Sequence, residues 1–143
     1  MIDLELAQDD RQRAALALLK AMEDRTLRDH IRGACTEDVV WANSGIPTLN
    51  GQQAIFDLMD GGGFARMIPI LREMTAFTAD ILHIASNGDA VFTERVDHHW
   101  DARGRDLMTP HICGIMEFRG DRICAIRDFY DVACYAQEPR EPA

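Results

Sequence analysis

The stretch SNGDAVFTERVDHHWDARGRD, residues 86–106, has the pattern of one β-strand between two tight turns. Both ends, SNGD and DARGRD, are rich in Gly, Asn and Asp, the residue types that hairpin turns use. Comparable β-type runs cover residues 74–84, 107–118 and 123–131, with RGDR between the last two. We therefore predict a four-stranded antiparallel meander in the second half of the chain.

The first half of the chain has a helical pattern. Residues 9–23 place apolar side chains at three- and four-residue spacing after Asp9 and Asp10, which suit a helix start. A second helix is predicted over 24–34, with Thr26 as its N-cap and Gly33 as its end. A β-type run at 37–44 precedes a third helical pattern at 52–59. The three glycines at 61–63 end that pattern, and Pro69 limits any helix that follows.

This order of elements predicts an α+β domain. We expect a strongly curved, mixed or antiparallel sheet that forms a cone-like partial barrel packed on the N-terminal helices. The open end of such a cone would be a pocket. With 143 residues, the chain is predicted to form a single domain over residues 1–143, with a flexible tail at 136–143.

Composition argues against several classes of partner. The net charge is -9, from 24 acidic and 15 basic residues, which disfavours nucleic acid and anionic membrane surfaces. No apolar run approaches the ~18 residues of a spanning helix, and the acidic N-terminus does not resemble a secretory signal. The cysteines form no C-x-x-C pair, so we predict buried, reduced thiols and a cytoplasmic location. They are Cys35, Cys113, Cys124 and Cys134.

The charged residues of the strand at 90–100 need an explanation. Alternation in a strand puts Arg95 and Asp97 on one face, together with Thr93 and His99. An exposed, salt-bridged strand face is the simpler interpretation of such a pair. The alternative is that both residues point into the pocket.

The last strand supports the second interpretation. Asp128 alternates onto the same face as Ile126 and Tyr130, which would direct it inward. Asp97 and Asp128 would then face each other with Arg95 between them, leaving one excess negative charge in a poorly hydrated place. Such a trio would share a proton, which is the condition for pairing a general acid with a general base.

A third stretch, VVWANSG, puts Trp41 and Asn43 on one face. A buried asparagine amide can both donate to and accept from a water molecule. The alternative for Asn43 is a local turn before Gly45.

The remaining pocket lining is predicted from the same alternation. Met74, Ile112, Ile126 and Tyr130 are candidates, with His99 beyond Asp97. Met22 and Leu19 of the first helix could face them, although apolar residues of this kind also form ordinary core. Because His98 and His99 are adjacent on a strand and point to opposite faces, we predict no metal site.

Three motifs together resemble the limonene-1,2-epoxide hydrolase family. They are FTERVD, RDFYD and an asparagine two residues after an aromatic residue in a β-type run. The resemblance runs from about residue 35 to 131. It implies the cystatin-like α+β fold shared with nuclear-transport-factor-like, polyketide-cyclase-like and ketosteroid-isomerase-like proteins.

The resemblance also implies an activity and roles for residues. An epoxide would be hydrolysed to a vicinal diol in one step, with no covalent enzyme intermediate, no metal and no cofactor. Asp128 would match the base that deprotonates water, and Asn43 would help to hold that water. Asp97 would match the acid that protonates the epoxide oxygen, and Arg95 the residue that bridges both carboxylates.

One position departs from the family pattern. Trp41 stands where the family usually has a tyrosine, and an indole N–H only donates a hydrogen bond, whereas a hydroxyl also accepts. Trp41 is therefore expected to contact the water or the substrate. The departure, together with His99, keeps open an aspartate-dependent isomerase or cyclase of the same fold. A non-catalytic ligand-binding dimer is a further alternative.

The expected partners are a small or medium apolar epoxide and water. We also expect a homodimer formed through the outer face of the sheet, where Glu94, Val96 and Phe129 would lie.

Overall fold

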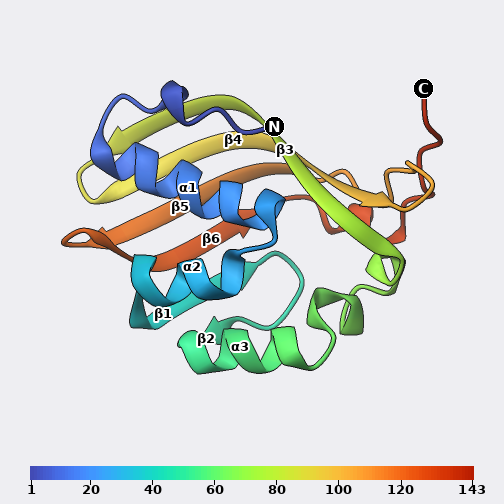
Figure 1. Ribbon diagram of the computed structural model, residues 1–143, viewed down its shortest axis with the longest axis horizontal. Helices are drawn as coiled ribbons and strands as arrows, with labels where there is room; N and C mark the ends of the chain where they lie inside the picture. Colours follow the sequence, from blue (N-terminus) through green and yellow to red (C-terminus); the bar gives the residue numbers. More distant parts are fainter.

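A curved, six-stranded mixed sheet organises the computed structural model, which describes residues 1–143 (Figure 1). The strand order is β2-β1-β6-β5-β4-β3, and only β1 and β6 pair in parallel. The α+β prediction and the mixed sheet are confirmed, and the sheet does not close into a barrel. The strands are β1 (Cys35–Asn43), β2 (Leu49–Asn50), β3 (Met74–Asn87), β4 (Ala90–Asp101), β5 (His111–Arg119) and β6 (Arg122–Phe129).

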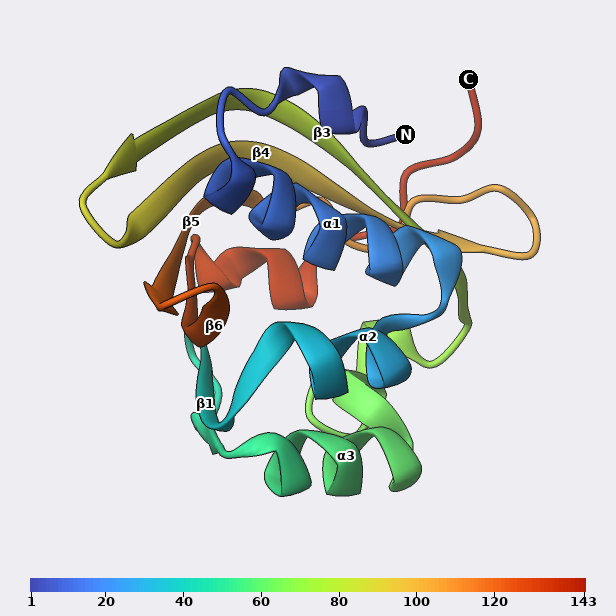
Figure 2. The ribbon, with the colours of Figure 1, turned by 60° about the vertical axis from the view of Figure 1, so that its left-hand side comes forward.

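Three α-helices lie on the inner side of the sheet, and β3 and β4 arch over α1 (Figure 2). The helices are α1 (Asp10–Asp24), α2 (Leu27–Ala34) and α3 (Gln52–Asp60). Short 3₁₀ helices are η1 (Leu4–Leu6), η2 (Gly63–Arg66), η3 (Pro69–Leu71) and η4 (Val132–Ala136). The core between helices and sheet includes Leu16, Leu19, Ile31, Val39 and Ile123.

The start of α1 has a side-chain cap, whereas Thr26, the predicted N-cap of the second helix, makes no side-chain capping hydrogen bond. The Asp9 side chain accepts a hydrogen bond from the Gln12 N–H at 2.7 Å, as an N-cap should. The prediction that the second helix stops at Gly33 is wrong, because α2 continues to Ala34. Cys35 then has extended backbone and starts β1 at once, so this helix end needs no left-handed glycine.

The strand between residues 107 and 118 starts later than predicted. Only His111–Arg119 forms β5, although Leu107 N–H still donates to the His99 carbonyl at 2.8 Å. Pro110 has no N–H to donate to the ladder, which explains why the regular strand begins after it. Residues 107–110 thus run beside β4 as an irregular segment, and this segment forms part of the site.

The C-terminal tail, predicted to be flexible from residue 136, makes contacts as far as Arg140. Asp106 and Arg140 exchange two backbone hydrogen bonds of 2.9 and 2.8 Å. The Gln137 side-chain oxygen accepts from the Thr109 N–H at 2.8 Å. The tail therefore holds the segment between β4 and β5 in place as far as Arg140.

The cysteine prediction holds in part. All four thiols are free, but only Cys35 is buried, and burial raises its pKa to about 11. Cys113 and Cys124 lie on the outer face of the sheet. The residues before and after each of them in the strand are buried, and side chains alternate between the two faces. No helix in the fold has the length and apolar character needed to cross a membrane.

Candidate active site

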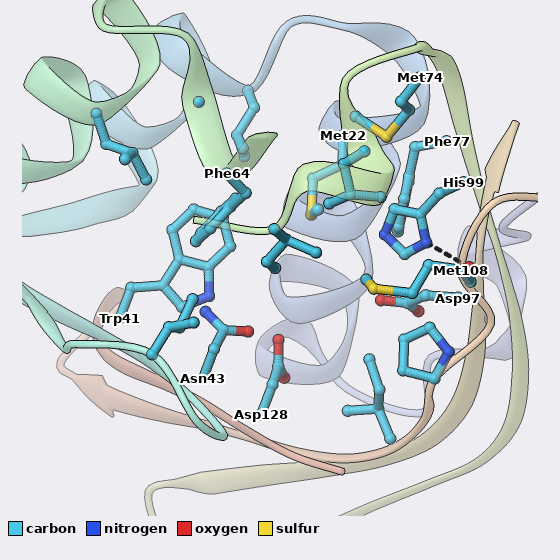
Figure 3. Close-up of a pocket in the computed structure, with 18 of the residues that line it drawn as sticks. Met22, Trp41, Asn43, Phe64, Met74, Phe77, Asp97, His99, Met108 and Asp128 are labelled. Atoms are coloured by element: carbon cyan, nitrogen blue, oxygen red, sulfur yellow. Dashed lines mark hydrogen bonds between the residues drawn. The ribbon is translucent and has the colours of Figure 1, made fainter. Parts of the chain in front are cut away.

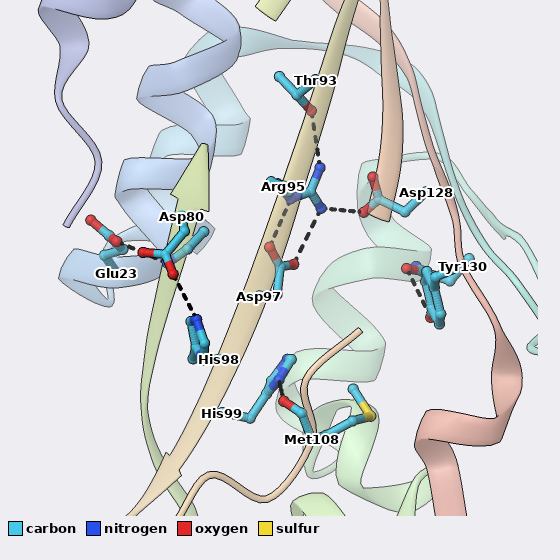
Figure 4. Close-up of polar contacts among 12 residues, drawn as sticks. Glu23, Asp80, Thr93, Arg95, Asp97, His98, His99, Met108, Asp128 and Tyr130 are labelled. Carbon is cyan, nitrogen blue, oxygen red and sulfur yellow. Dashed lines mark hydrogen bonds and ion pairs between the residues drawn. The ribbon is translucent and has the colours of Figure 1, made fainter. Parts of the chain in front are cut away.

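Strands β4 and β6 bring three charged side chains together on the inner face of the sheet (Figure 4). Arg95 donates from Nε to Asp97 Oδ1 at 2.8 Å and from Nη2 to Asp97 Oδ2 at 3.3 Å. The same Nη2 donates to Asp128 Oδ2 at 2.9 Å. Arg95 is only 1% exposed and the two aspartates 4% and 7%, so the exposed salt-bridge interpretation is wrong. The predicted trio is assembled as one buried cluster.

Gly114 on β5 makes room for this cluster. In the sheet register it pairs with Thr93 on one side and Asp128 on the other, so it lies directly between β4 and β6. A Cβ atom at this position would lie 2.4 Å from Arg95 Nη1 and 2.9 Å from Asp128 Oδ1. The absence of a side chain at Gly114 thus lets the guanidinium reach across a whole strand. Sequence reasoning missed this residue, and an isolated glycine inside a strand run was the available signal.

The cluster carries two carboxylates and one guanidinium in a dry environment. Burial raises the pKa of Asp97 above its usual value, although Arg95 opposes the shift, and the charge of Asp128 adds to it. Burial alone would lower the pKa of Arg95, but Asp128 and Asp97 outweigh it, so the guanidinium stays charged. Asp97 is therefore suited to hold the proton that the cluster needs for neutrality.

Asn43 lies beside Asp128, because the two residues are register partners on the parallel strands β1 and β6. Its Oδ1 accepts from the Tyr130 hydroxyl at 3.4 Å, and Tyr130 shares a 2.6 Å hydrogen bond with the Tyr135 hydroxyl. The Asn43 side chain thus contacts Tyr130 rather than a local turn. Tyr130 follows the end of β6 but still reaches the pocket.

Two buried polar atoms beside Asn43 have no hydrogen-bond partner: Trp41 Nε1 and Asp128 Oδ1. Trp41 packs its ring edge-to-face with Phe64 at 5.2 Å between ring centroids, and this contact fixes the indole on the cavity wall. Figure 3 shows Trp41, Asn43 and Asp128 along one side of the cavity, with Asp97 and His99 on the other. This wall offers a donor, an amide and a carboxylate to one small polar molecule.

The cavity has a volume of about 260 Å³, and 15 of its 21 lining residues are hydrophobic. Ligand pockets commonly measure about 300–1,000 Å³, so this cavity suits a small and mostly apolar molecule. Much of its wall comes from α3 and the 3₁₀ turns after it, including Leu58, Phe64, Ile68 and Leu71. Sequence reasoning missed Phe64, Ile68 and Leu71 because nothing in the irregular stretch around Pro69 says which way its apolar side chains point.

Most of the predicted lining residues do line the cavity: Met22, Met74, His99, Ile112 and Tyr130. Ile126 and Leu19 do not, and both belong to the hydrophobic core. Ile126 shares a face with Asp128 but lies two residues earlier on β6, about 7 Å deeper under the helices. Strand alternation correctly predicted that Ile126 points inward. Its position along β6 places it under the helices, in the hydrophobic core, and not in the cavity.

His98 and His99 point to opposite faces of β4. His98 bonds through its two ring nitrogens to Asp106 at 2.6 Å and Asp80 at 2.9 Å. His99 faces the cavity, and its Nδ1 lies 2.7 Å from the Met108 carbonyl oxygen. No group of three or more His, Cys, Asp or Glu side chains is arranged to hold a metal ion.

Comparison with models of known protein families identifies the family of this chain. A family model described as limonene-1,2-epoxide hydrolase catalytic domain matches residues 9–139. The chain belongs to the limonene-1,2-epoxide hydrolase family. No functionally curated protein gives a significant match.

Solved structures similar to this limonene-1,2-epoxide hydrolase family member include an LEH-like epoxide hydrolase from M. tuberculosis. It is 28% identical, with a TM-score of 0.65 over 89% of this chain and 86% of that one. A putative SnoaL-like polyketide cyclase from Jannaschia sp. CCS1 is 12% identical, with a TM-score of 0.70 over 96% and 100% of the two chains.

A protein with a ketosteroid-isomerase-like fold from Catenulispora acidiphila, solved with trimethylamine, is 15% identical, with a TM-score of 0.64 over 85% and 88%. At these identities the last two comparisons show the fold alone. The match to the family model is what assigns the chain to a family.

Proposed function

We propose that this protein is a cofactor-independent epoxide hydrolase that adds water to a small or medium, mostly apolar epoxide and releases a vicinal diol. The observation that carries the proposal is the buried cluster of Arg95, Asp97 and Asp128, opening on an apolar cavity. A pure binding module has no need to bury an excess negative charge.

The proposed reaction is a single displacement. Asp128 takes a proton from a water molecule, whose oxygen attacks one ring carbon of the epoxide. The ring carbon–oxygen bond breaks as Asp97 gives its proton to the departing oxygen, so general base and general acid act together. One proton then returns from Asp128 to Asp97 before the next turnover. Arg95 holds both carboxylates in place and stays charged throughout.

The water would be held by three groups on one wall. Trp41 Nε1 and Asp128 Oδ1 are buried without partners, so the indole N–H is free to donate a hydrogen bond and the carboxylate oxygen is free to accept one. Trp41 donates to the water oxygen, while Asn43 and Asp128 accept its two protons. Trp41 can supply the donor half of what a tyrosine hydroxyl would supply at this position.

A single-turnover experiment in ¹⁸O-labelled water tests this proposal. Enzyme in excess over a panel of aliphatic, cyclic and aryl epoxides should give a diol that carries label after the first turnover. An unlabelled first-turnover diol would mean that an aspartate oxygen attacked the substrate and water entered later. Absence of diol from every epoxide would remove the hydrolase assignment.

A second candidate is an aspartate-dependent isomerase or cyclase of the same fold. Trp41 in place of the usual tyrosine and His99 in the cavity favour it, since both change the polar lining of the pocket. Such an enzyme would convert its substrate without taking up label from water, so the same experiment separates the two.

We also propose a homodimer formed through the outer face of the sheet. Phe129 is 52% exposed there, which is unusual for a large apolar side chain on a strand. Light scattering of wild type and Phe129→Glu would test it, because a charge on that face should shift the protein towards the monomer. The cytoplasmic location stays a prediction from the sequence.

A further inference from the structure

His99 gives the cavity a polar group that the proposed reaction does not use. It lies on β4 two residues after Asp97, is only 9% exposed, and lines the cavity. Figure 3 shows one ring nitrogen directed at Met108 and the other facing the cavity. Phe77 packs edge-to-face against the ring, with 5.5 Å between centroids.

The hydrogen bond to Met108 fixes the chemical form of the ring. A carbonyl oxygen only accepts, so Nδ1, 2.7 Å away, carries the hydrogen. Burial lowers the pKa of His99, which keeps the ring neutral at physiological pH. Nε2 is then an acceptor, and no hydrogen bond within the protein uses it. The wall therefore holds, beside Asp97 and among apolar side chains, one oriented acceptor that no group of the protein uses.

A wholly apolar ligand would leave this acceptor without a partner, at a free-energy cost. A ligand with a donor in the right place would satisfy it. A neutral hydroxyl suits the site better than an ammonium group, because a charge in an apolar cavity is costly to desolvate. We propose that the preferred substrate is an epoxide that also carries a hydroxyl group, and that His99 Nε2 accepts the hydrogen bond from that hydroxyl. The inference rests on the proposed epoxide hydrolysis.

The strand geometry sets where the hydroxyl belongs on the substrate. Side chains two residues apart on one face of a strand are about 7 Å apart. With the epoxide oxygen at Asp97, the hydroxyl oxygen would lie about 7 Å from it, a distance that four carbon–carbon bonds and two carbon–oxygen bonds of an extended chain span. A terminal epoxide with a six-carbon chain and a hydroxyl on the far carbon meets this requirement.

A matched pair of substrates tests the proposal. One is that epoxy alcohol, and the other has a methyl group in place of the hydroxyl, with nearly the same size. The ratio of their kcat/KM values should fall by about 3- to 10-fold when His99 is replaced, as expected for one hydrogen bond, and the change should appear in KM. Measuring a ratio cancels any general loss of activity.

Three variants of His99 distinguish its role as a hydrogen-bond acceptor for the substrate from its role in holding the Met108 carbonyl. His99→Phe removes both ring nitrogens. His99→Asn keeps a donor near the Nδ1 position for the Met108 carbonyl but has no acceptor at Nε2. His99→Gln can place an amide oxygen near Nε2. The ratio should fall in the Phe and Asn variants and be largely retained in the Gln variant.

A binding measurement that needs no turnover completes the test. NMR titration compares the saturated six-carbon alcohol with the corresponding alkyl fluoride, which has no proton to donate. Wild type should prefer the alcohol, and His99→Asn should lose that preference. If both substrates and both ligands respond equally to all three variants, the proposal is wrong even though epoxides are hydrolysed. If the binding preference appears but no epoxide is hydrolysed, His99 recognises a hydroxyl and the hydrolase assignment fails instead.

Discussion

The two faces of β4 carry similar residue types in opposite environments. The inner face holds Arg95 and Asp97, both buried and bonded to each other. The outer face holds Glu94, which bonds to His83 at 2.8 Å and His111 at 2.7 Å in a largely exposed cluster. The sequence gives both faces of this strand charged residues, but only the inner face contributes to the cavity.

The carboxyl groups of Asp97 and Glu94 show how this difference in environment changes a pKa. Burial raises the pKa of Asp97 on the inner face, since removing a carboxylate from water disfavours its charge. Hydrogen bonds from His83 and His111 lower the pKa of Glu94 on the outer face, where solvent access keeps the desolvation effect small. Environment, and not residue type, thus favours the protonated form of Asp97 and the ionised form of Glu94.

The largest expected effect is the loss of enzymatic activity when Asp128 is replaced. Asp128→Asn keeps the size of the side chain and a hydrogen-bond acceptor for Arg95 but removes the base. Turnover of an epoxide substrate should fall about 10³-fold, within the range known for general bases. Rapid-quench kinetics would measure it, with circular dichroism as a check that the fold is kept. Activity near the wild-type level would mean that the inner cluster is structural.

Removing an arginine should destabilise the protein more on the inner face of the sheet than on the outer face. Arg95→Met leaves two carboxylates in a buried site and should cost about 3–5 kcal/mol in the free energy of unfolding. Arg127→Met is the outer-face control, because Arg127 bonds to Glu117 at 2.9 Å near solvent. That pair is screened and should contribute at most about 1 kcal/mol. Equal losses in urea denaturation would contradict the distinction between the faces.

A methyl group should act oppositely at two glycines. Gly114→Ala would force Arg95 or Asp128 to move and should cost about 1–3 kcal/mol, with loss of activity. Gly33→Ala is the control, since it lies within α2 and an added Cβ would meet nothing within 4 Å. Alanine favours a helix over glycine, so that variant should gain about 0.5–1 kcal/mol. Thermal unfolding of both variants would show whether opposite signs occur.

The smallest effects on stability are in its pH dependence. Because the pKa of Asp97 is raised, its contribution to stability is present below the unfolded-state value near 3.8 and is lost as pH rises through the folded-state value. The pKa of Glu94 is lowered, so its contribution is present above 4.5 and is lost as pH falls through the folded-state value. Unfolding of Asp97→Asn and Glu94→Gln against pH should remove slopes of opposite sign.

The same shift predicts how activity depends on pH. A general acid must be protonated, so kcat/KM should decline as pH rises above the raised pKa of Asp97, by about tenfold per unit at the limit. Stopped-flow assays across pH would measure it. A flat profile through that range would argue against Asp97 as the proton donor.

The sequence by itself determined the α+β class, the meander and which residues share a strand face: Arg95 with Asp97, Asp128 with Ile126, and Asn43 with Trp41. These are consequences of period-two alternation and turn chemistry, which act between near neighbours in the chain. The family motifs gave the same residues their expected roles. Alternation also predicted where Ile126 points, but not that it would be covered by the helices.

Only the tertiary structure decided which residues complete the site. Gly114 matters because the register of three strands puts it between Arg95 and Asp128, and register is a long-range property. His99 is an oriented acceptor only because the irregular segment before Pro110 brings the Met108 carbonyl to its Nδ1. Part of the apolar wall comes from the 3₁₀ turns after α3, whose residues have no periodic pattern. Such features depend on chain segments that meet only after folding, and no local pattern encodes them.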